Sequence, residues 1–261
     1  MLSFIDQTGR TVALANKPGR IISLVPSQTE LLADLGLDKE VVGITKFCIH
    51  PEHWFRNKTR VGGTKQVKMD IIHQLQPDLI IANKEENVKE QIKSLAEKYP
   101  IWISDINNLD DALVMIRDTG LMTGKQIAAK KITEQIAEGF AALTTPGYKL
   151  RTCYLIWKDP YMTVGGDTFI HNMLDAAGFE NVFSERKRYP VIKIEDLKQS
   201  GCELLLLSSE PFPFKQQHIN ELQQQLPKTK IMLVDGEMFS WYGSRLLKAP
   251  GYFHHLHGTL K

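Results

Sequence analysis

The chain has 261 residues, 43% of them hydrophobic, so it is long enough to bury one large core or two modest ones. Its 32 basic and 30 acidic residues leave a formal net charge of +2, and no basic stripe is interleaved with aromatic residues, which argues against nucleic acid as a partner. The three cysteines, Cys48, Cys153 and Cys202, form no CxxC pair, so neither a disulfide framework nor a zinc ribbon is indicated. The sequence leaves a single disulfide between two of them as an alternative.

The N-terminal segment MLSFIDQTGRTVAL has no charged region followed by a long apolar run, as an export signal would have. No later apolar run is long enough to cross a bilayer, so no transmembrane segment is expected. A cytoplasmic location is therefore one alternative, and a chain whose export signal had been removed would look the same.

The first part of the chain predicts an α/β lobe over residues 1–108. FIDQTGRTVAL predicts a β-hairpin that turns at Gly9. Ser27 and Glu30 have the spacing of a capping box, and Gly36 is a plausible end for the helix that they begin. Strands are predicted for RIISLVP, VVGIT, DLIIAN and IWISD, with helices at SQTELLADLG, 70–76 and 88–98. Apolar strands that alternate with helices imply a parallel sheet covered on both faces.

Residues 109–145 carry apolar side chains at helical spacing over more than an ordinary helix length, which predicts a long linking backbone helix. Gly120 and Gly124 are unfavourable inside a helix and leave two consecutive helices as the alternative. Residues 146–261 then predict a C-terminal α/β lobe, with strands at TCYLIW, ELLLLSS and KIMLVD and helices at TFIHNMLDAAG (capped by Asp167), IEDLKQSG and HINELQQQL. Two such lobes predict a ligand cleft lined by the loops that follow the strands.

Several segments, in this order, resemble one known family: D-x-x-G-R from Asp6, RIISLVPSQTELLADLG, VGGTK, QPDLIIAN, LMTGKQIA and MTVGGDTFIHNMLDAAGFENVF. The chain resembles the helical-backbone (class III) periplasmic binding proteins of ABC importers, receptors for cobalamin, haem and iron-siderophores, and the cobalamin-binding branch most closely. The resemblance implies two Rossmann-like lobes with parallel sheets, capture of a metal-chelate ligand between them, no cofactor and no catalysis. It also implies a monomer in the periplasm or tethered to the membrane, with an ABC transporter permease as partner.

By the same resemblance, one carboxylate of each lobe docks on the permease, and the matching positions are Asp70 and Glu195. Charge pairs of this kind orient an encounter more than they add affinity. The alternative is that Asp70 is an ordinary helix N-cap and Glu195 an ordinary first-turn acid, since carboxylates are favourable at helix N-termini.

Candidate ligand residues follow the predicted strands. The aromatic ones could stack on a flat macrocycle, and the cationic ones would suit carboxylates or phosphates. Alternatively, the aromatic residues pack between the lobes and the lysines are only solvated. Resemblance places Tyr189 where cobalamin receptors carry a contacting tryptophan, whereas Lys65 and Lys84 lie near aromatic positions of those receptors. The set comprises Lys46, Phe47, Cys48, His50, Lys65, Lys84 and Glu85 in the first lobe and Trp157, Tyr161, Tyr189, Glu210, Trp241, Tyr242 and Arg245 in the second. Further residues of the same loops are Trp54, Thr64, Glu86 and Phe212.

Enzyme signatures are missing from the sequence. It has no G-x-S-x-G elbow and no H-E-x-x-H pair, and Gly165-Gly166-Asp167 lacks the ending of a phosphate loop. Cys48 and His50 have the element types of a soft metal site, but their spacing is weak support for metal binding. The rival hypothesis is a cytoplasmic chelatase-like enzyme or chaperone of tetrapyrrole or metal metabolism with the same bilobed fold.

Overall fold

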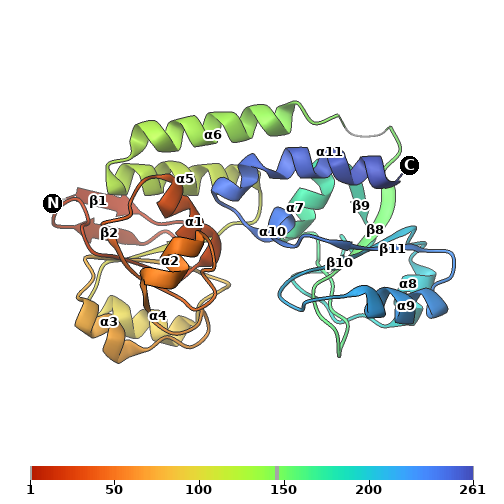
Figure 1. Cartoon of the computed structure of the whole chain (residues 1–261), viewed down its shortest axis with the longest axis horizontal. Helices are drawn as coiled ribbons and strands as arrows, with labels where there is room; N and C mark the ends of the chain where they lie inside the picture. The colour runs from red at the N-terminus through yellow and green to blue at the C-terminus, as the bar shows by residue number, and fades with distance from the viewer. Residues whose placement is uncertain (1, 145–146, 261) are drawn as a thin grey trace. The chain divides into compact units, whose positions relative to one another are not determined.

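The computed structural model describes residues 2–144 and 147–260. Its internal contacts divide the chain into two compact units (Figure 1). Unit 1 contains Met1–Ile106, Asp110–Ile136 and Tyr242–Arg245, and unit 2 contains Asn107–Leu109, Ala137–Trp241 and Leu246–Lys261.

Unit 1 begins with the predicted hairpin, in which β1 (Leu2–Ile5) and β2 (Thr11–Leu14) pair antiparallel. A five-stranded parallel sheet follows in the order β5-β4-β3-β6-β7, so the strand order reverses between β3 and β6. Ligands of open α/β sheets bind outside the carboxyl ends of the strands at such a reversal. The strands are β3 (Ile21–Ser23), β4 (Val41–Ile44), β5 (Thr59–Arg60), β6 (Leu79–Asn83) and β7 (Ile101–Ser104).

The helices of unit 1 cover this sheet. Ile72 of α3 and Leu95 of α4 pack with Ile22, Ile80 and Ala82 of the strands in one buried cluster. The helices that connect the strands are α1 (Pro26–Asp34), α2 (Glu52–Asn57), α3 (Met69–Leu75) and α4 (Lys89–Ala96).

Unit 2 contains a four-stranded parallel sheet in the order β11-β10-β8-β9, which reverses between β8 and β10. Leu205 and Leu207 of β10 pack with Leu197 of α8 and Leu222 of α9 in its core. The strands are β8 (Leu150–Leu155), β9 (Phe179–Asn181), β10 (Leu204–Ser208) and β11 (Lys230–Val234). The helices are α7 (Phe169–Ala176), α8 (Ile194–Gln199), α9 (Gln216–Gln225), α10 (Glu237–Ser240) and α11 (Ala249–Leu260). A 3₁₀ turn at Ser244–Leu247 has its first two residues in unit 1 and its last two in unit 2.

The predicted backbone helix over 109–145 is two helices, α5 (Leu109–Thr123) and α6 (Gln126–Ala141), as the alternative reading had it. Gly124 ends α5 with a φ of +67°, a conformation that favours glycine. A Cβ on Gly120 would lie 2.3 Å from the Cβ of Ala129, so glycine there allows α5 and α6 to approach closely. The division between the units falls inside α6, after Ile136. The predicted boundary at 145/146 lies outside the described residues.

Residues 242–245 correct the prediction that everything after 146 belongs to the C-terminal lobe, because they group with unit 1. Arg245 makes a two-pronged ion pair with Glu30 of α1, at 2.8 and 2.9 Å. A Cβ on Gly243 would lie 2.7 Å from the carbonyl oxygen of Ser27, so this segment lies directly against α1. Tyr242 and Arg245 are therefore residues of unit 1.

Two predicted helix starts also differ from the structure. Helix α1 begins at Pro26 with Val25 as its N-cap and no side-chain cap, so Ser27 and Glu30 lie inside the helix and form no capping box; Glu30 binds Arg245. The cap of α7 is Thr168, whose hydroxyl accepts from the amide of His171, while Asp167 accepts from the amide of Arg188.

The cysteines Cys48, Cys153 and Cys202 are all free, so the single bridge that the sequence left open does not form. Within the described ranges, none of the helices has both the length and the apolar character that a membrane span needs.

Candidate functional site

In unit 1, the loops after β4, β5 and β6 bring candidate residues to one edge of the sheet. The ammonium of Lys46 lies 5.0 Å from the centre of the Phe47 ring, and Phe47 is 50% exposed. The ammonium of Lys65 donates to the carbonyl of Glu85 at 2.5 Å, which joins the loop after β5 to the loop after β6. Strands that run parallel end at the same edge, so this clustering follows from the topology.

Two buried amides fix the loop after β6. Asn83 accepts from the amides of Glu85 and Glu86 at 2.8 and 3.0 Å, and its own amide is bound by the side chain of Asn87 at 2.8 Å. Asn87 also donates to the carbonyl of Thr64 at 3.0 Å. Side-chain amides of this kind replace backbone turns and hold a loop in one conformation. Lys84 and Glu85 are therefore carried on a rigid support.

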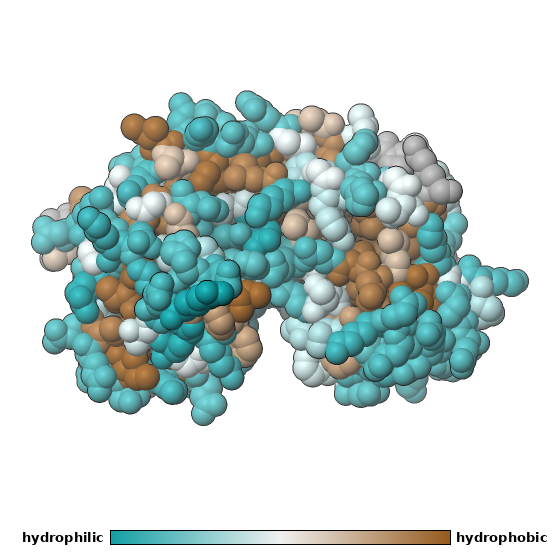
Figure 2. All heavy atoms as spheres, viewed as in Figure 1, coloured by the Kyte–Doolittle hydropathy of each residue, from teal (hydrophilic) through white to brown (hydrophobic). Residues whose placement is uncertain are grey.

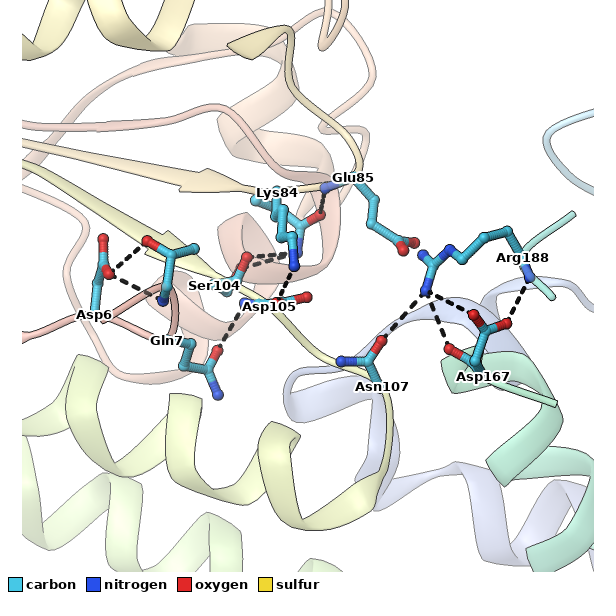
Figure 3. A network of polar contacts seen from close by, with 11 residues as sticks. Asp6, Gln7, Lys84, Glu85, Ser104, Asp105, Asn107, Asp167 and Arg188 are labelled. Atoms are coloured by element: carbon cyan, nitrogen blue, oxygen red, sulfur yellow. Dashed lines mark hydrogen bonds and ion pairs between the residues drawn. The ribbon is translucent and has the colours of Figure 1, made fainter. Parts of the chain in front are cut away.

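Lys84 belongs to a separate polar contact in the same unit (Figure 3). Its ammonium binds the carboxylate of Asp105, the residue after β7, and the amide of Asp105 donates to Gln7 at 3.1 Å. Lys84 is exposed and its charge is partly neutralised by this contact, whereas Lys46 has a π-face beside it.

In unit 2, an aromatic pair lies where the strand order reverses. Trp157 follows β8 and Phe212 follows β10, their ring centres are 5.7 Å apart in an edge-to-face arrangement, and Trp157 is 40% exposed. Phe212 continues inward to Phe214 at 4.8 Å and His218 at 5.4 Å. Tyr161 is half-buried against the same core. Trp157 and Phe212 therefore form an apolar surface that packs on the core of unit 2.

Arg188 is a candidate that the sequence reasoning missed. It lies in the loop after β9, its amide donates to Asp167 at 2.5 Å, and its guanidinium donates to Asn107 at 3.5 Å (Figure 3). The guanidinium also lies 5.6 Å from the centre of the Tyr189 ring. Its position directly before Tyr189-Pro190 was the available signal, because a cation beside a loop aromatic is a common pairing.

Glu210 and Trp241 contact each other instead of pointing outward. The carboxylate of Glu210 accepts from the indole of Trp241 at 2.9 Å and from the hydroxyl of Ser240 at 2.6 Å. Burial raises the pKa of Glu210, and the hydrogen bond from Ser240 only partly opposes this. Trp241 is 6% exposed, so this pair is built into the packing of the loop after β10.

Cys48 lies in the interior of unit 1, and His50 is half-buried. The thiol of Cys48 is hydrogen bonded to the hydroxyls of Thr29 and Thr45, each at 3.1 Å, and burial raises its pKa. Among the residues that the structure describes, no group of three or more His, Cys, Asp or Glu side chains could hold a metal ion. Tyr242 and Arg245 are buried and bind Glu86 and Glu30.

Asp70 and Glu195 are both exposed. Asp70 lies in the first turn of α3, where the N-cap is Lys68, and Glu195 lies in the first turn of α8. Both carboxylates thus lie at the N-terminus of a short helix, and α8 carries Asp196 beside Glu195 in the same turn.

Comparison with known proteins gives the family. A vitamin B12-binding protein of Vibrio parahaemolyticus is 27% identical over 206 residues, 76% of this chain and 74% of that protein. Two crystal structures from Vibrio cholerae match the fold. The periplasmic vitamin B12 binding protein BtuF matches with a TM-score of 0.75 and 19% identity, over 94% of this chain and 99% of that one. The periplasmic heme binding protein HutB matches with a TM-score of 0.77 and 19% identity, over 91% of this chain and 98% of that one. The model of the periplasmic binding protein family matches residues 21–231. The chain is therefore a member of the periplasmic binding protein family.

Proposed function

We propose that this chain is the receptor of an ABC importer and captures a metal chelate of the cobalamin, haem or ferric siderophore type. The family supports a binding role, and the named relatives bind vitamin B12 or haem. The observation that carries the proposal is an exposed aromatic ring at a strand end in each unit, Phe47 in unit 1 and Trp157, packed on the half-buried Phe212, in unit 2.

The chemistry of these surfaces fits a large, flat, partly charged molecule. Aromatic faces supply contact area at little entropic cost, and cations beside them can bind the carboxylates or phosphates of such ligands. Lys46 and Lys65 carry this role in unit 1, and Tyr189 with Arg188 in unit 2. We assign Glu210, Trp241, Tyr242, Arg245 and Cys48 a supporting role, since each is hydrogen bonded within its own unit.

The proposal includes delivery to a permease through Asp70 and Glu195. Both carboxylates are exposed and each lies in the first turn of a helix, which leaves them accessible to a partner's cations. Replacing each with lysine should weaken the permease interaction and its salt dependence and leave ligand affinity unchanged. Loss of ligand binding in the same variants would contradict the assignment.

The proposal places the protein in the periplasm, as a monomer that returns its ligand chemically unchanged. No catalytic step and no cofactor belongs to it. Incubation with haem or cobalamin followed by mass spectrometry should recover the ligand intact. A changed product, or metal insertion into a free tetrapyrrole, would instead support the chelatase-like alternative.

The experiment that tests the proposal is a thermal-shift panel of cobalamin, haem, a ferric hydroxamate and a free ferric salt. A ligand specific for the folded state stabilises it by about 2.7 kcal/mol at a hundredfold excess over its Kd. We expect one chelate class to raise the Tm and the free ferric salt to leave it unchanged. A panel without any shift would contradict the proposed ligand class.

A further inference from the structure

A hollow in unit 1 lies between the hairpin and the junction of α5 and α6. Its volume is about 310 Å³, and its walls include Leu2 and Phe4 of β1 and Leu121 and Met122 of α5. Among the described residues that line it, Lys17 is the one with a charge. The Lys17 side chain reaches over the helix junction, since a Cβ on Gly124 would lie 3.0 Å from its Cε atom.

The rim of this hollow exposes apolar side chains. Leu2 is 45% exposed and Leu121 is 51% exposed, and Ile127, which does not line the hollow but follows the lining residue Gln126 in the first turn of α6, is 90% exposed. Figure 2 shows apolar atoms projecting at the start of α6 beside hydrophilic ones. Single exposed apolar residues are ordinary, but several around one hollow indicate an interaction surface.

Lysines stand beside the apolar rim. Lys130 and Lys131 follow Ile127 at three and four positions along α6, which places them on the same helix face. Glu134 lies on that face as well and pairs with Lys130 at 3.7 Å, so the lysines outnumber the acid. Lys17 adds a further positive charge at the hollow. The surface is therefore apolar at its centre and cationic at its edge.

We infer that this surface, consisting of Leu2, Leu121, Ile127, Lys17, Lys130 and Lys131, binds the surface of an anionic lipid bilayer. Exposed apolar side chains can enter the headgroup region while flanking lysines are attracted to anionic lipids. A second copy of the chain fits less well, because a two-fold interface apposes the same patch from both copies and would bring lysines toward lysines. The inference is independent of the proposed ligand and permease.

The test is co-sedimentation of the full chain with vesicles of phosphatidylcholine alone and of equimolar phosphatidylcholine and phosphatidylglycerol, at low salt. We expect sedimentation with the anionic vesicles only. K130Q/K131Q should weaken it by about fivefold per lysine. L121S/I127S should weaken it at least tenfold, whereas V191S, which changes a 54% exposed valine of unit 2, should bind like the parent chain.

All the substituted side chains are exposed, and a thermal melt checks that the fold is retained. Failure to sediment with anionic vesicles, or sedimentation that neither double variant changes, would overturn the inference. A dimer in light scattering that L121S/I127S dissociates would overturn it too, by assigning the surface to a second copy. Ligand binding is measured separately in the thermal-shift panel, so neither outcome of the vesicle experiment bears on the proposed receptor function.

Discussion

Arg245 and Glu30 lie 215 positions apart in the chain and form a bidentate ion pair, with side chains 8% and 11% exposed. The pair binds the segment Tyr242–Arg245, near the C-terminal end of the chain, to α1 of unit 1. Removing one partner of a buried pair leaves the other charge uncompensated, which costs more than the pair itself contributes.

We therefore predict that Arg245→Ala lowers the free energy of unfolding by about 3–5 kcal/mol in urea titrations. The matched control is Lys130→Ala, which removes an exposed pair with Glu134 and should cost less than about 0.5 kcal/mol. Equal effects of the two substitutions would contradict the role given to Arg245.

Asp6 should make the stability of unit 1 depend on acid pH. Burial by itself would raise the pKa of its carboxyl, but hydrogen bonds from the Arg10 amide, the Thr8 hydroxyl and the Arg10 guanidinium outweigh burial and lower the pKa below its ordinary 3.8. The ionised carboxyl of Asp6 therefore contributes its full stabilisation at pH values above the ordinary pKa, and this stabilisation is lost as the pH falls through the lowered pKa of the folded chain.

For Asp6→Asn we expect a loss of about 1.5–3 kcal/mol at neutral pH, the range for hydrogen bonds to charged groups. The loss should shrink when unfolding is measured at decreasing pH below about 4, since the parent carboxyl becomes protonated there. A loss that stays constant from neutral to acid pH would show that packing, and not charge, accounts for it.

Glu210 should behave in the opposite sense. Because burial raises the pKa of its carboxyl above the ordinary 4.5, the folded chain holds this proton more tightly than the unfolded chain does. The protonated carboxyl of Glu210 thus stabilises the folded chain at pH values below the ordinary pKa, and this stabilisation is lost as the pH rises through the raised pKa of the folded chain.

Glu210→Gln keeps an oxygen that can accept from Ser240 and Trp241, so we predict unchanged or higher stability at neutral pH. Glu210→Ala removes the carboxylate that accepts from the Trp241 indole, while Ser240 keeps the carbonyl of Gly236 as an acceptor, and should cost about 1–3 kcal/mol. Calorimetry of the two variants tests this. If the charge of Glu210 were required, the Gln variant would lose as much stability as the Ala variant.

The three thiols should react slowly in the native protein. Burial raises the pKa of Cys48 and Cys153, and it raises that of Cys202 to about 11, so thiolate is scarce at all three sites. Titration with a chromogenic disulfide should be slow in buffer and complete in guanidinium. A thiol that reacts rapidly in buffer would reveal local opening.

Local patterns predicted much of each unit. The hairpin around Gly9 and the parallel strands follow from turn residues and apolar runs, which act over a few positions. The single helix predicted over 109–145 was wrong, and Gly124 supported only the two-helix alternative. Phe47 and Trp157 were placed in strand-end loops because they come at the end of predicted strands along the chain, and the structure has them directly after β4 and β8.

What local patterns missed depends on distant partners. Helix α11 contains Pro250, Gly251 and several histidines, but Phe253 packs against Phe140 and Phe239, and this contact stabilises a helix of weak propensity. The return of 242–245 to unit 1 depends likewise on Glu30, and no periodicity could reveal it. The short strands β5 and β9 have too few residues to show an alternation.

The central claim concerns capture of a metal chelate by the strand-end aromatic residues, and calorimetric titration of variants tests it most directly. With the chelate that shifts the Tm of the parent chain, Trp157→Ala and Tyr189→Ala together should abolish measurable binding while the unliganded Tm stays nearly unchanged. Val191→Ala, an exposed apolar control in the same unit, should bind as the parent does. Retained affinity in the double variant would contradict the site proposed for unit 2.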